Sequence, residues 1–76
     1  MDTIYDMLAE IKPEHDFKSS EDYIEDGLLD SFDLIALISM LEEEYHITVD
    51  ALDIVPENFC DAQAIVNLVK NSGGAI

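Results

Sequence analysis

Residues 30–45, DSFDLIALISMLEEEY, carry the clearest helical pattern in the chain. Apolar side chains recur there at i, i+3, i+4, i+7 and i+11, which is the spacing of one face of a helix. The residues on this face are Leu34, Leu37, Ile38, Leu41 and Tyr45. We therefore predict a helix that begins at Asp30 or Ser31, runs to about Tyr45 and turns this face toward the core.

A second, shorter apolar face lies on the same predicted helix and consists of Phe32, Ile35 and Ala36. Two interpretations fit it. The helix is central and covered by neighbours on two sides, or the second face is an exposed patch that docks a partner. The sequence leaves both interpretations open.

Before this helix, Ile4, Leu8 and Ile11 follow each other at helical spacing and Pro13 prevents continuation, which predicts a first helix over about residues 3–11. Residues 12–30 show no sustained period and predict a long loop, in which Gly27 supplies a turn. Several apolar residues should pin this loop onto the core. They are Phe17, Tyr23, Ile24, Leu28 and Leu29.

After the central helix, Asp50 can cap a short third helix over Leu52 to Ile54, stopped by Pro56. Asp61 can cap a last helix, which Gly73 and Gly74 end. The inward residues of that last helix should be Ile65, Leu68 and Val69. The run at 47–49 is assigned to a connecting loop. The prediction is one all-α domain over residues 1–76 with four helices joined by loops.

Size and charge restrict the function. A 76-residue domain buries only about 60–65% of the surface of its unfolded chain, so a stand-alone enzyme is not expected. Eighteen acids against three Lys or Arg give a net charge of -15, which repels nucleic acids and anionic membranes and favours basic protein partners. The single cysteine, Cys60, cannot form an internal disulfide and no apolar leader is evident, so a reducing cytoplasm is the expected setting. We also expect the chain to be a monomer.

Catalytic and metal sites are not supported by the residue pattern. A calcium loop centred on Gly27 would place Ile24 and Asp33 at two positions that require other ligands. His15 and His46 lack companions at metal-ligand spacing. Cys60 has no neighbouring base in sequence that would lower its pKa.

Ser31 is the unusual residue. Because Asp30 can cap the central helix and Asp33 supplies first-turn charge, the Ser31 hydroxyl is not needed for capping. A phosphate ester on that oxygen would lie beside the free backbone N–H groups of the helix N-terminus, which favour a phosphoryl anion. Neither a His nor a Lys follows Ser31 closely enough in sequence to activate it, so Ser31 resembles a substrate rather than a nucleophile with its own base.

At Asp30-Ser31-Phe32, followed by a helix that continues into LEEEYHITV, the chain resembles the acyl and peptidyl carrier proteins. Their signature is Asp-Ser-Leu, and Phe32 replaces the Leu here. The resemblance covers nearly the whole chain and implies a small acidic four-helix bundle. It also implies that Ser31 receives 4'-phosphopantetheine from coenzyme A and that an acyl or aminoacyl group is carried on that arm as a thioester.

Within this family the run Gly27 to Phe32 looks most like that of the D-alanyl carrier proteins, which deliver D-alanine to teichoic acids. Phe59 stands where these proteins have Trp, and Asp61-Ala62 replaces their Thr-Pro. Fatty-acid or polyketide carriers remain an alternative. An acidic helical regulatory protein without a prosthetic group is an alternative from another class.

The resemblance implies three kinds of partner: a phosphopantetheinyl transferase, an acyl- or aminoacyl-activating ligase, and a downstream acyltransferase with a basic docking surface. Exposed apolar residues would form the centre of each contact and acids its rim. The expected recognition residues are Asp30, Phe32, Asp33, Ile35, Glu42 and Glu43.

Overall fold

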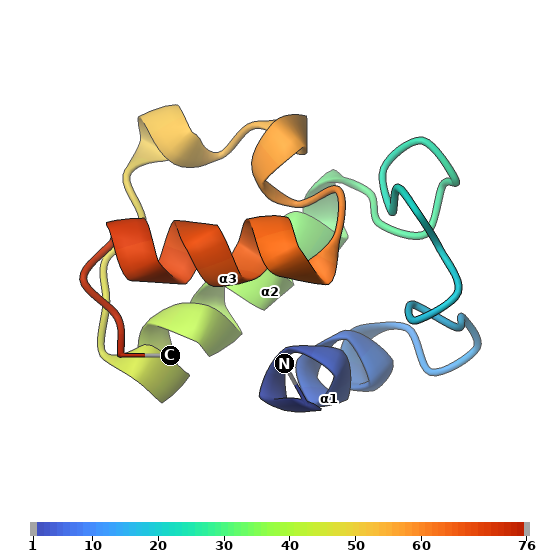
Figure 1. The fold of residues 1–76 in the computed structure, drawn as a ribbon, viewed down its shortest axis with the longest axis horizontal. Coiled ribbons are helices and arrows are strands. Elements are labelled where there is room, and N and C mark those ends of the chain that lie inside the picture. The colour runs from blue at the N-terminus through green and yellow to red at the C-terminus, as the bar shows by residue number, and fades with distance from the viewer. Residues whose placement is uncertain (1, 76) are drawn as a thin grey trace.

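The computed structural model describes residues 2–75, and their regular structure is entirely helical. The elements are α1 (Asp2–Ile11), α2 (Ser31–Tyr45), the 3-10 turns η1 (Ala51–Asp53) and η2 (Pro56–Asn58), and α3 (Ala62–Asn71). In Figure 1, α3 crosses in front of α2, α1 lies below α3 and to the right of the lower end of α2, and η1 and η2 lie above α3. The all-α prediction is therefore confirmed.

The predicted bundle of four helices is not confirmed, because the described residues contain three α-helices. The short third helix is replaced by two separate single turns. Asp50 does cap the first of them, since its carboxylate accepts a 2.9 Å hydrogen bond from the Leu52 N–H. Pro56 begins the second turn, and its missing N–H and fixed φ keep the two turns from joining into one helix. A single turn is also too short to offset the cost of helix nucleation.

The inward faces predicted for the three α-helices meet in one core. Ile4 and Leu8 of α1 and Leu37 and Leu41 of α2 are fully buried, as are Ile65 and Val69 of α3. At the margin of this core, the outermost members of the predicted faces are half-buried. These are Ile11, Leu34 and Tyr45.

The long loop between α1 and α2 is fastened to the core as predicted. Phe17, Tyr23 and Leu29 are buried, and the rings of Phe17 and Tyr23 meet edge to face with 5.0 Å between their centroids. The Tyr23 N–H donates to the Cys60 carbonyl at 2.6 Å, which ties the loop to the segment before α3. Gly27 adopts a φ of 74° that L-residues disfavour, and this supplies the predicted turn before α2.

The last helix begins and ends at the predicted signals. The Asp61 carboxylate accepts a 2.7 Å hydrogen bond from the Ala64 N–H. After α3, Gly73 has a φ of 94°, and the Gly74 N–H donates to the Val69 carbonyl at 2.8 Å. Gly74 also packs so closely on Val69 that a Cβ there would collide with its side chain. The chain thus turns back over the end of α3.

Within residues 2–75, no helix has both the length and the apolar character needed to cross a bilayer.

The excess of acidic over basic side chains should make the stability of the fold depend on salt concentration. Among the described residues, one Lys forms an ion pair, Lys12 with Asp33 at 3.6 Å, and the His15 ring lies 3.9 Å from the Glu14 carboxylate, a contact that becomes an ion pair only when His15 is protonated. Because most of the acids are uncompensated, raising salt from 0.01 M to 0.1 M shortens the screening length from about 30 Å to about 10 Å and should stabilise the fold. Thermal unfolding should show a gain of about 1 kcal/mol, or ~4–8 °C in Tm. A Tm independent of salt would contradict this expectation.

Candidate functional site

Two aspartates on either side of Ser31 close a reciprocal hydrogen-bond pair at the start of α2. The Asp33 N–H donates to the Asp30 carboxylate at 3.0 Å, and the Asp30 N–H donates to the Asp33 carboxylate at 3.1 Å. This capping box satisfies the Asp33 N–H at the helix N-terminus and fixes the direction in which the chain enters α2. The predicted cap at Asp30 is confirmed.

Ser31 is the first residue of α2, is exposed, and contributes no atom to the capping box. Its hydroxyl lies at the helix end where backbone N–H groups and the helix dipole favour an anion. The hydrogen bond from the Asp33 N–H lowers the pKa of the Asp30 carboxyl, which makes that carboxylate a weaker base toward the neighbouring hydroxyl. These surroundings can stabilise a phosphate ester on Ser31 but do little to activate the oxygen.

The second apolar face of α2 is exposed. Phe32 has 83% of its surface accessible and Ile35 has 63%, so neighbours do not cover the helix on this side. The interpretation in which neighbours cover this face is therefore wrong, and the face is exposed. The face continues along α2 through Ser39 and Glu43, both exposed and both at helical spacing from Phe32. Ser31 thus stands at one end of an exposed strip that starts apolar and ends acidic.

Two of the predicted recognition residues are withdrawn from solvent and make internal contacts. Asp33 is 9% exposed and lies 3.6 Å from the Lys12 ammonium. Glu42 is half-buried, and its carboxylate accepts a 3.0 Å hydrogen bond from the Val49 N–H, which holds the loop after α2. The structure therefore leaves Phe32, Ile35 and Glu43 exposed, together with Asp30 at the helix start.

Sequence reasoning missed Lys12 and Leu52. Lys12 follows α1 directly, and no local pattern indicates that it reaches Asp33 across the long loop. Leu52 was expected in a short helix, yet it is 85% exposed on η1. A single turn has too few residues to show a periodicity from which exposure could be read.

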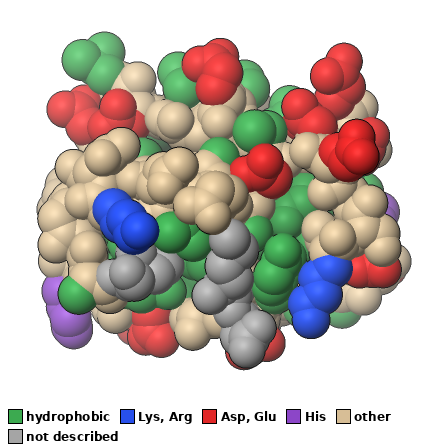
Figure 2. Space-filling model, in the orientation of Figure 1, with side chains coloured by type: hydrophobic (Ala, Val, Ile, Leu, Met, Phe, Trp, Pro, Cys, Tyr) green, Lys and Arg blue, Asp and Glu red, His purple; other side chains and the backbone are tan. Residues whose placement is uncertain are grey.

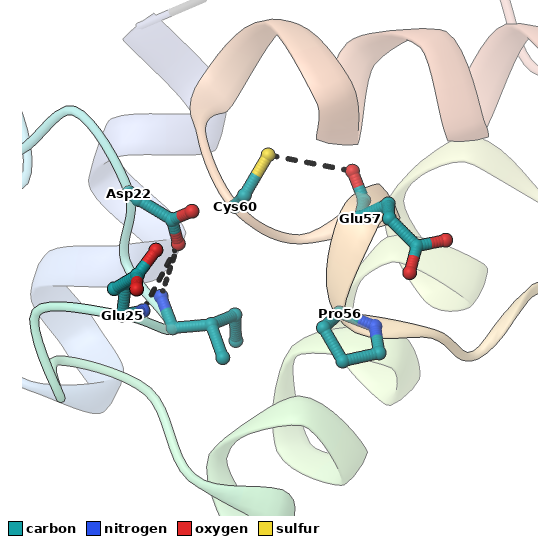
Figure 3. Close-up of a pocket in the computed structure, with 6 residues that line it drawn as sticks. Asp22, Glu25, Pro56, Glu57 and Cys60 are labelled. Atoms are coloured by element: carbon teal, nitrogen blue, oxygen red, sulfur yellow. Dashed lines mark hydrogen bonds between the residues drawn. The ribbon is translucent and has the colours of Figure 1, made fainter.

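Cys60 borders an open pocket of about 580 Å³ between the long loop and η2 (Figure 3). The thiol contacts the Glu57 carbonyl oxygen at 3.4 Å, and the Asp22 carboxylate across the pocket accepts hydrogen bonds from the N–H groups of Ile24 and Glu25. Burial raises the pKa of the Cys60 thiol, and the negative charges of Asp61 and Asp22 raise it further. The thiolate is correspondingly disfavoured.

If an acyl or aminoacyl group is loaded onto this chain, Cys60→Ala should leave that loading unchanged, because the protonated thiol is a poor nucleophile. In the unaltered chain, the reaction of the Cys60 thiol with iodoacetamide at pH 7.5, followed by intact-mass measurement, should be slower than that of free cysteine. A rate equal to or above the free amino acid would show that the surroundings activate this thiol. Loss of loading in a folded Cys60→Ala variant would assign Cys60 a direct role.

On the face of the molecule shown in Figure 2, acidic side chains lie mostly along the upper edge, with apolar side chains between and below them. In the described part of the chain, no group of three His, Cys, Asp or Glu side chains is arranged to hold a metal ion. His46 is exposed at the end of α2 with a φ of 54°, a conformation that Gly or Asn adopts more easily. His15 packs its ring edge-on against Phe17.

No protein-family model, curated protein or solved structure matches this chain.

Proposed function

We propose that this chain is a carrier protein that holds an activated acyl or aminoacyl group on a 4'-phosphopantetheine arm attached to Ser31. The observation that carries the proposal is the position of Ser31, an exposed first residue of a helix whose cap is formed entirely by Asp30 and Asp33. The resemblance of Asp30-Ser31-Phe32 to the carrier signature supports the same role. On the same basis we propose a carrier-type bundle, in which η1 and η2 take the place of the short third helix.

The residues around Ser31 suit a covalent phosphodiester. The exposed hydroxyl is accessible to a transferase, and the N-terminal end of α2 offers a favourable field to the phosphate. The arm supplies a terminal thiol that can carry the cargo as a thioester, so each partner meets a tethered group at high effective concentration. The chain itself contributes the attachment oxygen and the surface by which partners position it.

The exposed strip of α2 is the docking surface in this proposal. Phe32 and Ile35 supply the apolar centre next to the attachment oxygen, and Glu43 supplies negative charge for basic partners. The transferase, ligase and acyltransferase must bind in turn, and a small charged surface suits short-lived contacts. Asp33 and Glu42 serve this surface by holding α2 in place.

Phe32→Ala should slow transfer of cargo from the activating ligase to the carrier by about thirtyfold in kcat/KM, because truncating an interface aromatic costs about 2 kcal/mol. The measurement is the rate of cargo attachment to arm-bearing protein, followed by intact mass. Leu52→Ala removes an equally exposed apolar side chain from η1 and should change the rate by less than about twofold. Equal losses in both variants would argue against a docking centre on α2.

We propose D-alanine as the cargo, on the basis of the run Gly27 to Phe32. Arm-bearing protein incubated with D-alanine, ATP and a D-alanine-activating ligase should gain the mass of one D-alanyl group. Preferred loading by a malonyl or long-chain acyl transferase would replace D-alanine with a fatty-acid or polyketide cargo. Failure of the chain to accept the arm from a phosphopantetheinyl transferase would instead favour an acidic interaction protein without a prosthetic group.

A further inference from the structure

A second surface lies on the other half of α2, away from Ser31. It is an open groove of about 700 Å³ between α1 and the C-terminal half of α2. Its first wall consists of residues at i, i+3, i+4 and i+7 of α1, namely Thr3, Asp6, Met7 and Glu10. Its second wall consists of Met40, Glu43 and Glu44 of α2, with His46 just beyond the helix end. Two helix faces therefore form one continuous groove.

The groove combines an apolar floor with negative edges. Met7 is 7% exposed and Met40 half-buried, and Met side chains adapt their shape to the surface that packs on them. Carboxylates stand on both walls, with Asp6 and Glu10 on α1 facing a wall that includes Glu44 on α2. None of the chain's three Lys residues is among the residues that line the groove. Negative charge on both sides of an apolar floor is complementary to a positively charged amphipathic ligand.

The spacing of the carboxylates favours several positive charges over one. Asp6 and Glu10 are four residues apart, which is about 6 Å along the helix axis, and Glu43 and Glu44 stand on the opposite wall. Lys and Arg side chains lay their apolar stems on hydrophobic surface and extend the charged head to its edge. Such side chains would place their stems over Met7 and Met40 and their heads against the carboxylates.

We propose that this groove binds a short basic amphipathic segment of a partner protein, with Lys or Arg side chains separated by about one helical turn. The length of the α1 wall, Thr3 to Glu10, corresponds to about two turns of helix, so it accommodates two such side chains along each edge. Glu43 is shared with the exposed strip of α2, so the groove extends the acidic end of that strip onto α1.

The groove acts independently of the attachment serine. Residues 40–44 lie 9 to 13 positions beyond Ser31 on α2, which places them about 14–20 Å along the helix axis from it. A partner held in the groove would leave Ser31 accessible to a second protein. The inference goes beyond the proposed carrier function, and its test uses the chain without an arm, so either one can fail while the other stands.

The test is titration of isotope-labelled protein with a peptide that places Arg and Leu along one helical face, followed by amide NMR shifts at about 0.15 M salt. The reference probe is a scrambled peptide of the same composition. Two double variants carry the same charge change. Asp6→Asn/Glu10→Gln removes two groove carboxylates, and Glu21→Gln/Glu25→Gln removes two exposed carboxylates of the long loop.

The shifts are expected to concentrate at residues 3–10 and 40–46, and the patterned peptide should bind more tightly than its scrambled isomer. The groove variant should weaken binding by about tenfold and the loop variant by less than about twofold, because only the first loses direct partners. Circular dichroism should show both variants folded. Shifts spread evenly over the acidic surface, equal losses in the two variants, or saturation of the groove by Mg²⁺ alone with no effect of the peptide would each overturn the proposal.

Discussion

Ser31→Ala should remove all mass gain from a phosphopantetheinyl transferase reaction while leaving the fold intact. The loss should be complete, because the substitution deletes the one oxygen to which we assign the arm. The fold should persist, since Asp30 and Asp33 close the capping box without the Ser31 hydroxyl and Ala is a good helix former. Intact-mass spectrometry reports the first result, and thermal unfolding should show a change within about 0.5 kcal/mol of the original chain.

Ser39→Ala is the matched control for this substitution. Ser39 is an exposed serine on the same side of the same helix, two turns further along. The Ser39→Ala variant should accept the arm to the same extent as the original chain. A Ser31→Ala variant that still gains the arm would place the attachment elsewhere, and a variant that unfolds would show that the hydroxyl contributes to the start of α2.

Phe59→Ala should destabilise the chain by about 3–5 kcal/mol, because it empties a fully buried aromatic site. A 76-residue domain has a total stability of only about 4–11 kcal/mol, so this variant should be marginally folded or unfolded. Urea unfolding monitored by circular dichroism measures the change. The backbone N–H of residue 59 donates to the Pro56 carbonyl at 3.0 Å and is kept in the variant, so the expected loss comes from the side chain alone.

Phe32→Ala provides the comparison, because it makes the same chemical change at a side chain that is 83% exposed. Its unfolding free energy should change by no more than about 0.5 kcal/mol, although its docking to the ligase should be impaired. The two phenylalanines thus separate a structural role from a recognition role. Equal destabilisation by the two substitutions would mean that Phe32 is packed in solution and not free for a partner.

The features that could be predicted from sequence are those set by neighbours along the chain. The Asp30 and Asp61 caps depend on atoms three residues away, and the inward faces of the α-helices follow from the i, i+3, i+4 spacing. The attachment of the long loop to the core could be predicted because large aromatic side chains such as Tyr23 are usually buried, and so small a domain has one core in which to bury them. Local chemistry was sufficient for these elements.

The features that could not be predicted depend on contacts between distant residues. The pairing of Lys12 with Asp33 crosses the whole long loop, and it turns a residue expected at a docking rim into a buried anchor. Glu42 likewise accepts from Val49, which no periodicity indicates. For the second face of α2, the spacing showed that Phe32 and Ile35 share a side but not whether another element covers it. That question was answered by the packing of α1 and α3.

The most direct test of the proposed carrier role is to locate the modification on the unaltered chain. The protein would be incubated with a phosphopantetheinyl transferase, coenzyme A and Mg²⁺, digested, and its peptides fragmented in a mass spectrometer. We expect one phosphopantetheine group per chain, with fragment ions that place it on Ser31. An unmodified chain, or a group found on Ser39, Cys60 or another side chain, would contradict the assignment of Ser31 as the carrier serine.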